Sequence, residues 1–598
     1  MLLLALALPL AFAQNQQPLY LTYTFNPLEH LAGIAPYFEP ADPPRSPSPP
    51  QGCKVTKAAY LVRHAAINAN DFDYESYLEP FTQKLGNTSQ KWSNTSDLSF
   101  LATWFPPAVE EEEMLTRTGR LEASQLAVQL SYRYPDLRLP STVWASSAER
   151  TVASAKGFIR GIELEDNTIN LTTIYEGKEA GANSLIPYSS CPAYHGSMGA
   201  EQSQAYVKVF TAPILARFKA YAPNFNWTSS DVIGMLEYCG YETVIRGSSP
   251  FCSGDLFTPD EWLQFEYSQD IMYYQNVGYG HQEFTGAVGL PWVNATVNLL
   301  SSESSEEDMY VSFTHRELPP MVLVALGLFN NSALTGANLP NATMPLDRVN
   351  HHRTWISSYI LPFLTNIAIE KMNCSASFGF ENATDPTYYR VLVNRSPQTL
   401  PSCYDGPAES CSAKGMETFL RGRTEVVGEY SERCGVDYSN STDVLSIYTA
   451  NVTGKAVAHN KSPINLTMPS HRSSLLPNIA ALISLLPVAL GIAALYSPRT
   501  ALSNLSFPLP ASHEAQALAE ALVRFYSGRN IAIGLTNLLA WYGGHRNVLG
   551  GNMIIGTVVA GVDGWASRVL LGAGTVEWGH WVFTLLGLGL GGGILGWW

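Results

Sequence analysis

The sequence has few basic residues for its length of 598 residues, with 36 Lys and Arg against 51 Asp and Glu and a formal net charge of −15. No basic patch stands out, which argues against nucleic acid as a partner. No Cys-x-x-Cys pair occurs, which argues against a zinc site, and we expect neither a metal nor a cofactor. Because an acidic surface repels polyanions, any phosphate pocket must be locally basic. The run Glu110–Glu113 is interpreted as a solvated loop or helix start.

The N-terminus and the cysteines indicate the secretory pathway. Residues 1–13 are apolar and end in Ala11-Phe12-Ala13, which is typical of a signal peptide although a basic start is lacking. All eight cysteines lie between Cys53 and Cys434, an even number that predicts up to four disulfides of undetermined connectivity. Fourteen Asn-x-Ser/Thr sequons between Asn87 and Asn465 suit a glycoprotein.

Composition divides the remaining chain into four parts. Residues 14–52 are rich in proline and predict a stiff, extended lead-in. Residues 53–435 mix strand-like and helical patterns and hold all the cysteines, which predicts one large α/β unit. Residues 436–472 are polar and rich in sequons, which predicts a glycosylated linker. Residues 473–598 differ in carrying long apolar stretches.

Those stretches predict a four-helix membrane domain, with spans at Leu475–Tyr496, Phe525–Trp541, Val548–Leu571 and Trp578–Trp598. Their lengths approach the roughly 20 residues that cross a bilayer, although the second is short. Asp563 is costly in lipid, and Arg529 and His580 are its candidate partners, in a functional or a purely structural pair. We therefore expect a cell-surface or endomembrane protein with its first part lumenal or extracellular, or a secreted one if the tail is a fusion of two reading frames.

Three strand-like segments are followed by side chains suited to phosphate chemistry. These side chains are Arg63 and His64 after the run 58–62, Arg150 after the run 141–147, and His315 and Glu317 after the run 309–314. Strand ends of an α/β sheet converge at one edge, where ligands bind. An imidazole can attack phosphorus, cations can bind the phosphate oxygens, and an acid can protonate the leaving alkoxide.

These segments, together with Leu115–Arg120 and the loop Asn276–Gly280, occur in the order of the histidine acid phosphatase family, and the chain resembles its secreted fungal acid phosphatases and phytases. The resemblance implies an α/β fold, in which a sheet carries helices on both faces and a mainly helical insertion spans residues 165–290. It also implies hydrolysis of small phosphomonoesters, with inositol phosphates as a possible class.

The resemblance assigns roles to the five side chains. His64 would be the nucleophile that forms a phosphohistidine, and Arg63, Arg150 and His315 would bind the phosphate. The common family pattern is His-Asp, whereas here Glu317 stands two residues after His315. This spacing resembles the inositol-polyphosphate phosphatase branch, in which the Glu donates the proton; the alternative is a structural Glu317.

The residues after His64 depart from the family pattern Arg-His-Gly-x-Arg-x-Pro, since Ala65 replaces the glycine and Ile67 the second arginine. Loss of one charge-assisted pair costs about 1.5–3 kcal/mol of ligand binding, which Asn68, Asn70 or Arg316 would offset in part. The alternative function is therefore a weak or inactive phosphate-binding homologue displayed at a membrane. The C-terminal part resembles a small four-helix fungal domain of unknown function, which is compatible with transport or anchoring.

Overall fold

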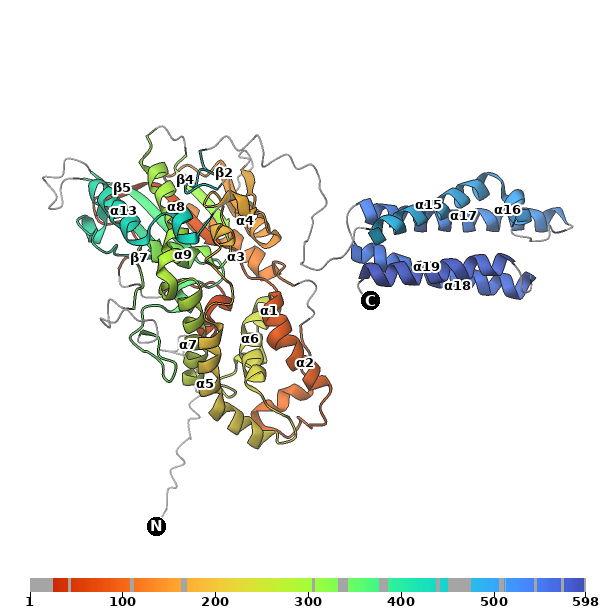
Figure 1. Cartoon of the computed structure of the whole chain (residues 1–598), viewed down its shortest axis with the longest axis horizontal. Coiled ribbons are helices and arrows are strands. Elements are labelled where there is room, and N and C mark those ends of the chain that lie inside the picture. Colours follow the sequence, from red (N-terminus) through yellow and green to blue (C-terminus); the bar gives the residue numbers. More distant parts are fainter. Residues whose placement is uncertain are drawn as a thin grey trace, which may run out of the picture. The chain divides into compact units, whose positions relative to one another are not determined.

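A computed structural model describes residues 25–40, 43, 45–107, 112–162, 169–303, 307–331, 343–375, 386–436, 441–449, 475–504, 510, 512–542, 546–571 and 575–595. The predicted signal peptide at residues 1–13 and most of the predicted linker lie outside the described residues. The chain forms two compact units, Met1–Ala456 and Val457–Trp598, and each is described by itself (Figure 1).

The N-terminal unit is built on one eight-stranded sheet in the order β3-β2-β4-β1-β5-β6-β7, with β8 paired to β6. The strands are β1 (Cys53–Arg63), β2 (Thr142–Ser146), β3 (Asn170–Ile174), β4 (Met309–Thr314), β5 (Asn366–Cys374), β6 (Thr387–Val393), β7 (Ser396–Gln398) and β8 (Cys411–Ser412). Strands β1 to β4 are parallel, and β5 runs antiparallel to β1. All of β4 and residues 57–63 of β1 are buried, as in strands covered on both faces.

Helices cover both faces of this sheet, as predicted. They include α3 (Arg117–Arg133), α4 (Glu149–Ile162), α8 (Gln282–Ser301), α9 (Leu318–Ala325), α12 (Ser357–Ile360), α13 (Ala413–Val427) and α14 (Tyr430–Cys434). In β4, the Phe313 ring packs 5.7 Å from that of Phe158 in α4. The adjacent Ser312 points to the opposite face, where its hydroxyl lies 2.7 Å from that of Tyr448, which accepts a hydrogen bond from Trp292 of α8.

The helical insertion forms the other end of the unit (Figure 1). It contains α5 (Ala200–Tyr221), α6 (Ser229–Arg246) and α7 (Pro259–Asn276), all within the predicted range of 165–290. An earlier stretch, with α1 (Asp71–Asp73), the π-helix η3 (Tyr74–Leu78), α2 (Glu79–Gly86) and η4 (Ser96–Ala102), joins it, which the sequence analysis did not predict. There Trp104 packs edge-on against Tyr238 and Phe251, each with ring centroids 5.0 Å apart.

Two segments that were assigned to the lead-in and the linker pack against the core. In the predicted lead-in, η1 (Pro27–His30) and η2 (Ala32–Ile34) are followed by Ala35, and Ala35 is fully buried. In the predicted linker, Leu445 and Ile447 are buried among core residues. These contacts are made by a few apolar side chains within a proline-rich and a sequon-rich stretch. The average composition of each stretch does not reveal such side chains.

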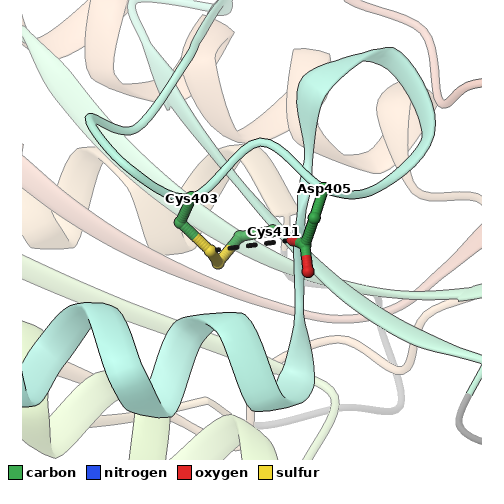
Figure 2. A group of neighbouring side chains, drawn as sticks. All are labelled: Cys403, Asp405 and Cys411. Atoms are coloured by element: carbon green, nitrogen blue, oxygen red, sulfur yellow. Dashed lines mark hydrogen bonds between the residues drawn. A yellow bond between two sulfur atoms is a disulfide. The ribbon is translucent and has the colours of Figure 1, made fainter.

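All eight cysteines form disulfides, which confirms the prediction of up to four and supplies the pairing: Cys53–Cys374, Cys191–Cys434, Cys239–Cys252 and Cys403–Cys411. Figure 2 shows Asp405 beside the Cys403–Cys411 bridge. The sulfur atoms of Cys403 and Cys411 and a carboxylate oxygen of Asp405 lie within 4.8 Å of one another, a spacing that would suit a metal ion. Because the two sulfurs are joined, they are not thiolates, and Asp405 instead accepts hydrogen bonds from the Ser412 backbone and hydroxyl at 2.9 and 2.6 Å.

The C-terminal unit is helical, with α15 (Leu475–Tyr496), α16 (Pro498–Asn504), α17 (His513–Tyr542), α18 (Arg546–Leu571) and α19 (Thr575–Leu595). Among the described residues, Leu476–Tyr496 and Val548–Ala566 are long and apolar enough to cross a membrane, and Trp581–Gly591 is a shorter apolar helix. Four spans therefore remain a prediction. Asp563 pairs with Arg529 at 2.6 Å, one of its two predicted partners; the side chain of the other, His580, lies outside the described residues.

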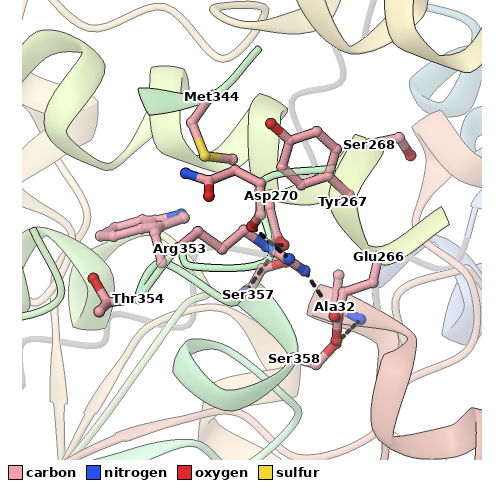
Figure 3. Close-up of polar contacts among 12 residues, drawn as sticks. Ala32, Glu266, Tyr267, Ser268, Asp270, Met344, Arg353, Thr354, Ser357 and Ser358 are labelled. Carbon is pink, nitrogen blue, oxygen red and sulfur yellow. Dashed lines mark hydrogen bonds and ion pairs between the residues drawn. The ribbon is translucent and has the colours of Figure 1, made fainter. Parts of the chain in front are cut away.

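A buried ion-pair network joins the insertion to the segment before β5 (Figure 3). The guanidinium of Arg353 donates to Asp270 at 2.6 Å and to Glu266 at 3.0 Å, both on α7. The other Asp270 oxygen accepts from the backbone and hydroxyl of Ser357, at 2.6 and 2.5 Å. The hydroxyl of Ser358 accepts from the backbone of Ala32 at 2.8 Å, so the same segment also holds the N-terminal stretch in place.

We predict that Arg353→Met destabilises the N-terminal unit by about 3–5 kcal/mol, because it leaves the buried Asp270 without its cation and Glu266 with only His30. The matched control is Arg348→Met. Arg348 pairs with Asp347, and the two side chains are 75% and 72% exposed. An exposed pair of this kind contributes at most about 1 kcal/mol to stability. Urea unfolding followed by tryptophan fluorescence measures both. Equal midpoints for the two variants would contradict the assignment.

Candidate active site

The side chains that follow β1, β2 and β4 line one cavity of about 190 Å³ at the carboxyl edge of the sheet. The structure brings together all five residues singled out from the sequence, namely Arg63, His64, Arg150, His315 and Glu317. The three strands are neighbours in the sheet and parallel, so their ends meet where the topology requires.

His64 follows β1 and is 3% exposed. Its Nδ1 lies 2.9 Å from the carbonyl oxygen of Ala65; because a carbonyl only accepts, Nδ1 carries the hydrogen and Nε2 keeps a lone pair. Burial lowers the pKa of His64 well below its ordinary value, and the charges of Arg63 and Arg150 lower it further. The imidazole is therefore neutral, as a nucleophile must be.

The loop after His64 is held closely by the start of α3. Thr116 is the N-cap of α3: its hydroxyl accepts from the Gly119 backbone at 3.0 Å and donates to the Ala66 carbonyl at 3.1 Å. A Cβ on Gly119 would overlap that carbonyl, so only glycine allows this approach. The Ala65 backbone N–H donates to Ser154 of α4 at 2.9 Å. The two helices thus fix the backbone that carries His64.

Arg63 is 3% exposed, and its Nη1 donates to two backbone carbonyls, those of Gly33 and Leu361, both at 2.6 Å. Its guanidinium lies 4.6 Å from the centre of the Phe363 ring. Burial, and then the charge of Arg316, lowers the pKa of Arg63 to about 9, which leaves it cationic at acidic and neutral pH. Its Nε has no protein partner among the described residues. A buried, unpartnered donor at the wall of a cavity is suited to an anion.

Arg150 lies in the first turn of α4, where the helix dipole disfavours a cation. Its Nη1 donates to the carboxylate of Glu113 at 2.6 Å, and Glu113 lines the same cavity. Glu113, which was assigned to a solvated run, therefore forms an ion pair with a cation that was expected to bind the ligand.

His315 is oriented by a carboxylate that the sequence analysis missed. Its Nε2 lies 3.2 Å from Oε1 of Glu176, which also accepts from the Ala148 backbone at 3.0 Å and from the hydroxyl of Ser146. Burial raises the pKa of Glu176, but the hydrogen bond and charge of His315 and the bond from Ser146 outweigh it and lower the pKa to about 2. Glu176 is thus an anion that holds the His315 ring 5.9 Å, centre to centre, from the His64 ring.

Glu317 stands at the N-cap position of α9, and its side chain accepts from Nη2 of Arg316 at 3.0 Å and from Nε at 3.2 Å. Burial raises the pKa of Glu317, but the charges of Arg316 and His315 outweigh it and lower the pKa to about 2. The carboxylate is therefore ionised in the ligand-free site, so its protonation requires a change in the charges around it.

Ile67 lies in the cavity wall at the position of the expected second arginine and is 4% exposed. Of the residues considered as substitutes, Asn70 and Arg316 line the cavity, and Asn68 is not among the lining residues. Arg316 is thus the third guanidinium of the site, although it is paired with Glu317.

A second cavity of about 320 Å³ adjoins the first, because Ile34, Asn70, Phe72 and Arg316 line both. Its walls include the carboxyl groups of Asp73 and Glu237. Burial raises the pKa of both groups, and the hydrogen bond from Tyr241 lowers that of Asp73 in part. Arg316 is the only cationic side chain among its described lining residues. The second cavity thus holds one cation and two carboxyl groups whose burial favours the neutral form.

Comparison with known proteins agrees with this geometry. Residues 45–394 match the histidine phosphatase superfamily (branch 2), and residues 484–594 match a domain of unknown function (DUF4267). A thiamine-repressible acid phosphatase of Schizosaccharomyces pombe is 31% identical over 446 residues, covering 69% of this chain and 92% of the relative. A phytase of Candida albicans is 26% identical over 430 residues, covering 69% and 88%.

Among solved structures, the phytase from D. castellii aligns with a TM-score of 0.64 at 24% identity, covering 72% of this chain and 92% of that one. This likeness establishes the phytase-like α/β fold. Because the family match spans more than half of the chain and the acid phosphatase relative is matched over nearly its whole length, the chain belongs to branch 2 of the histidine phosphatase superfamily.

Proposed function

We propose that this enzyme hydrolyses phosphomonoesters by way of a phosphohistidine on His64. The observation that carries the proposal is a buried neutral imidazole, with its Nε2 lone pair retained, in one small cavity with Arg63 and Arg150. The acid phosphatases and the phytase among the relatives support hydrolysis of phosphate esters. They do not favour the alternative of an inactive phosphate-binding homologue.

In the first step, Nε2 of His64 attacks phosphorus and the bond to the ester oxygen breaks. Negative charge on the non-bridging oxygens is balanced by the unpartnered Nε of Arg63, by Arg150 and by His315. In the second step, water attacks the phosphohistidine, inorganic phosphate leaves, and the imidazole is restored.

Glu317 is proposed to protonate the leaving oxygen and then to take the proton of the attacking water. It is ionised when the site is empty, because its pKa is about 2. A monoester carrying one proton on its phosphate loses it when three guanidinium groups favour the dianion. That proton can pass to Glu317, since the bound anion offsets the field of Arg316 that lowers its pKa.

Esters with a single phosphate are proposed as the preferred substrates, rather than inositol hexakisphosphate. Ile67 stands at the position of the second arginine of the family pattern. In addition, Glu113 forms an ion pair with Arg150, and Glu317 forms one with Arg316. The adjoining cavity has Arg316 as the one cation among its described lining residues, so it offers little positive charge for further phosphate groups. This charge distribution suits a neutral or hydroxyl-bearing leaving group.

A lumenal or extracellular location is proposed for the N-terminal unit. Four disulfides and the absence of a free cysteine among the described residues favour an oxidising compartment. The two candidate membrane spans favour attachment to a membrane.

His64→Ala is expected to lower kcat for p-nitrophenyl phosphate by at least about 10⁴-fold, as removal of a covalent nucleophile does elsewhere. Wild-type enzyme mixed with a ³²P-labelled ester and quenched in alkali, where a phosphohistidine survives, should carry label on His64. The control is His281→Ala, because His281 is exposed and outside the cavity. Activity retained by His64→Ala would end the proposal.

Glu317→Gln is expected to lower kcat by about 10²–10⁴-fold for glycerol 2-phosphate, whose alkoxide needs a proton. For p-nitrophenyl phosphate, whose leaving group is stable as an anion, the loss should be far smaller. Glu283→Gln, an exposed substitution, is the control. Equal losses for the two esters would show that Glu317 is not the acid.

The same assay yields a pH profile whose direction follows from the lowered pKa of Glu317. Because the proton arrives with the substrate monoanion, kcat/KM should fall as pH rises above about 6, where phosphate esters lose their second proton. It should stay flat from about pH 3 to 5, well above the pKa of about 2 of the empty site. A fall beginning at pH 3 would instead assign the proton to free Glu317.

Glu113→Gln is expected to free Arg150 and to tighten competitive inhibition by inorganic phosphate by about two- to five-fold, the range for a partly exposed ion pair. The control is Glu112→Gln, which makes the same change in net charge one residue away. Weaker inhibition in Glu113→Gln would mean that Glu113 holds Arg150 in its binding position and does not compete with the ligand.

A further inference from the structure

The C-terminal unit contains a cavity that the phosphatase reaction does not use. It has a volume of about 490 Å³, within the range of small-molecule sites, and is lined by residues of all five helices α15 to α19. Both candidate membrane spans contribute to it, Leu476–Tyr496 through Ser484 and Val548–Ala566 through Met553 and Gly556. A molecule in this cavity would therefore sit against the helices best suited to a lipid environment.

Most of the cavity wall is apolar, but one buried acceptor faces no partner. Asn537 of α17 lines the cavity and is 4% exposed. Its Nδ2 lies 3.1 Å from the hydroxyl of Ser484 and 3.6 Å from the sulfur of Met553, so it contacts α15 and α18. Its Oδ1 has no hydrogen-bond partner among the described residues.

The orientation of this amide follows from the serine. Ser484 donates its only hydrogen to the carbonyl of Ala480, at 2.8 Å, so its oxygen accepts from Asn537. The Oδ1 atom must then point away from Ser484. A buried carbonyl oxygen left unpaired costs about 1–3 kcal/mol, which a ligand with an O–H or N–H group would recover.

The charge in the cavity is balanced. Asp563 is the only acidic or basic side chain among its described lining residues, apart from the phenol of Tyr526. Arg529 donates to Asp563 at 2.6 Å, and its guanidinium lies 4.6 Å from the centre of the Tyr526 ring. An ionic ligand would have no free counter-charge, so an uncharged one fits better.

The space does not reflect loose packing of the helices. A Cβ on Gly534 of α17 would lie 2.7 Å from the Ser484 carbonyl of α15, and a Cβ on Gly587 of α19 would lie 3.1 Å from the Met553 carbonyl of α18. Glycine thus brings each pair of helices into backbone contact. At Gly556, in the cavity wall, a Cβ would meet no atom within 4 Å.

We propose that this cavity binds an uncharged lipid with a hydroxyl group on a largely apolar body, such as a sterol or a diacylglycerol. The hydroxyl donates to Oδ1 of Asn537, and the apolar body lies against α15 and α18. The site is independent of the phosphatase cavity, and no phosphate group takes part in binding.

The test uses the full-length chain in a mild detergent, with radiolabelled cholesterol and dioleoylglycerol as separate probes. Gly556→Leu fills the cavity and should lower binding of the bound probe at least ten-fold. The matched control is Gly561→Leu on the same helix, because a Cβ there also meets no atom within 4 Å but Gly561 is not a lining residue. Hydrolysis of p-nitrophenyl phosphate, which should not change, reports that the N-terminal unit is folded, and an unchanged helix content by circular dichroism reports that the C-terminal unit is folded.

Asn537→Leu tests the hydrogen bond and should weaken binding about ten-fold, the value of one buried bond. Thr536→Val, at the exposed neighbouring position, should leave it unchanged. Selective binding of either probe supports the proposal and identifies the lipid. Binding of neither, equal binding by the Gly556→Leu and Gly561→Leu variants, or equally tight binding of dioleoyl phosphatidic acid would overturn it, and wild-type affinity in Asn537→Leu would remove Asn537 from the site.

Discussion

The crowding of positive charge at the carboxyl edge of β1 and β4 constrains the rest of the N-terminal unit. Three guanidinium groups and two imidazoles line a cavity of about 190 Å³. Their repulsion is offset by groups from distant parts of the chain: the carbonyls of Gly33 and Leu361 and the carboxylates of Glu113, Glu176 and Glu317. The fold has to bring all of these segments to one edge. The Arg353 network fixes the N-terminal stretch that contains Gly33, and the N-cap of α3 fixes the loop after His64. The same field keeps His64 neutral and Glu317 ionised.

The groups that carry the chemistry were within reach of sequence reasoning because each lies at the end of a buried strand or within four residues of it. The runs 58–62, 141–147 and 309–314 are short and strand-like, and parallel strands end at a common edge of the sheet. Strand-like and helical patterns over residues 53–435 predicted an α/β unit, and the resemblance to the histidine acid phosphatase family implied a sheet with helices on both faces. An even number of cysteines indicated disulfides, but only the fold supplies their pairing.

The groups that position the chemistry were not predictable, since no local pattern marks them. Glu176 stands in an ordinary turn after β3, and it matters only because β3 lies beside β2 in the sheet. Gly33 belongs to a stretch that composition describes as a spacer, yet its carbonyl accepts from Arg63. Glu113 ends a run of acidic residues that resembles a solvated surface. In each case the decisive fact is a contact between residues far apart in sequence, which periodicity does not encode.

The pairing of Cys191 with Cys434 has a mechanical consequence. It closes a covalent link across 243 residues, between the entry to the helical insertion and the last helix of the N-terminal unit. Any tension on the chain from the C-terminal side reaches Tyr448 and its neighbours first, whose contacts are non-covalent, and then this bridge. A pull of that kind would peel away residues 441–449 first, and with the bridge intact it could not extend the chain between Cys191 and Cys434, which includes β4 and His315. Detachment of residues 441–449 would thus leave this closed loop, with His315 in it, at its folded length.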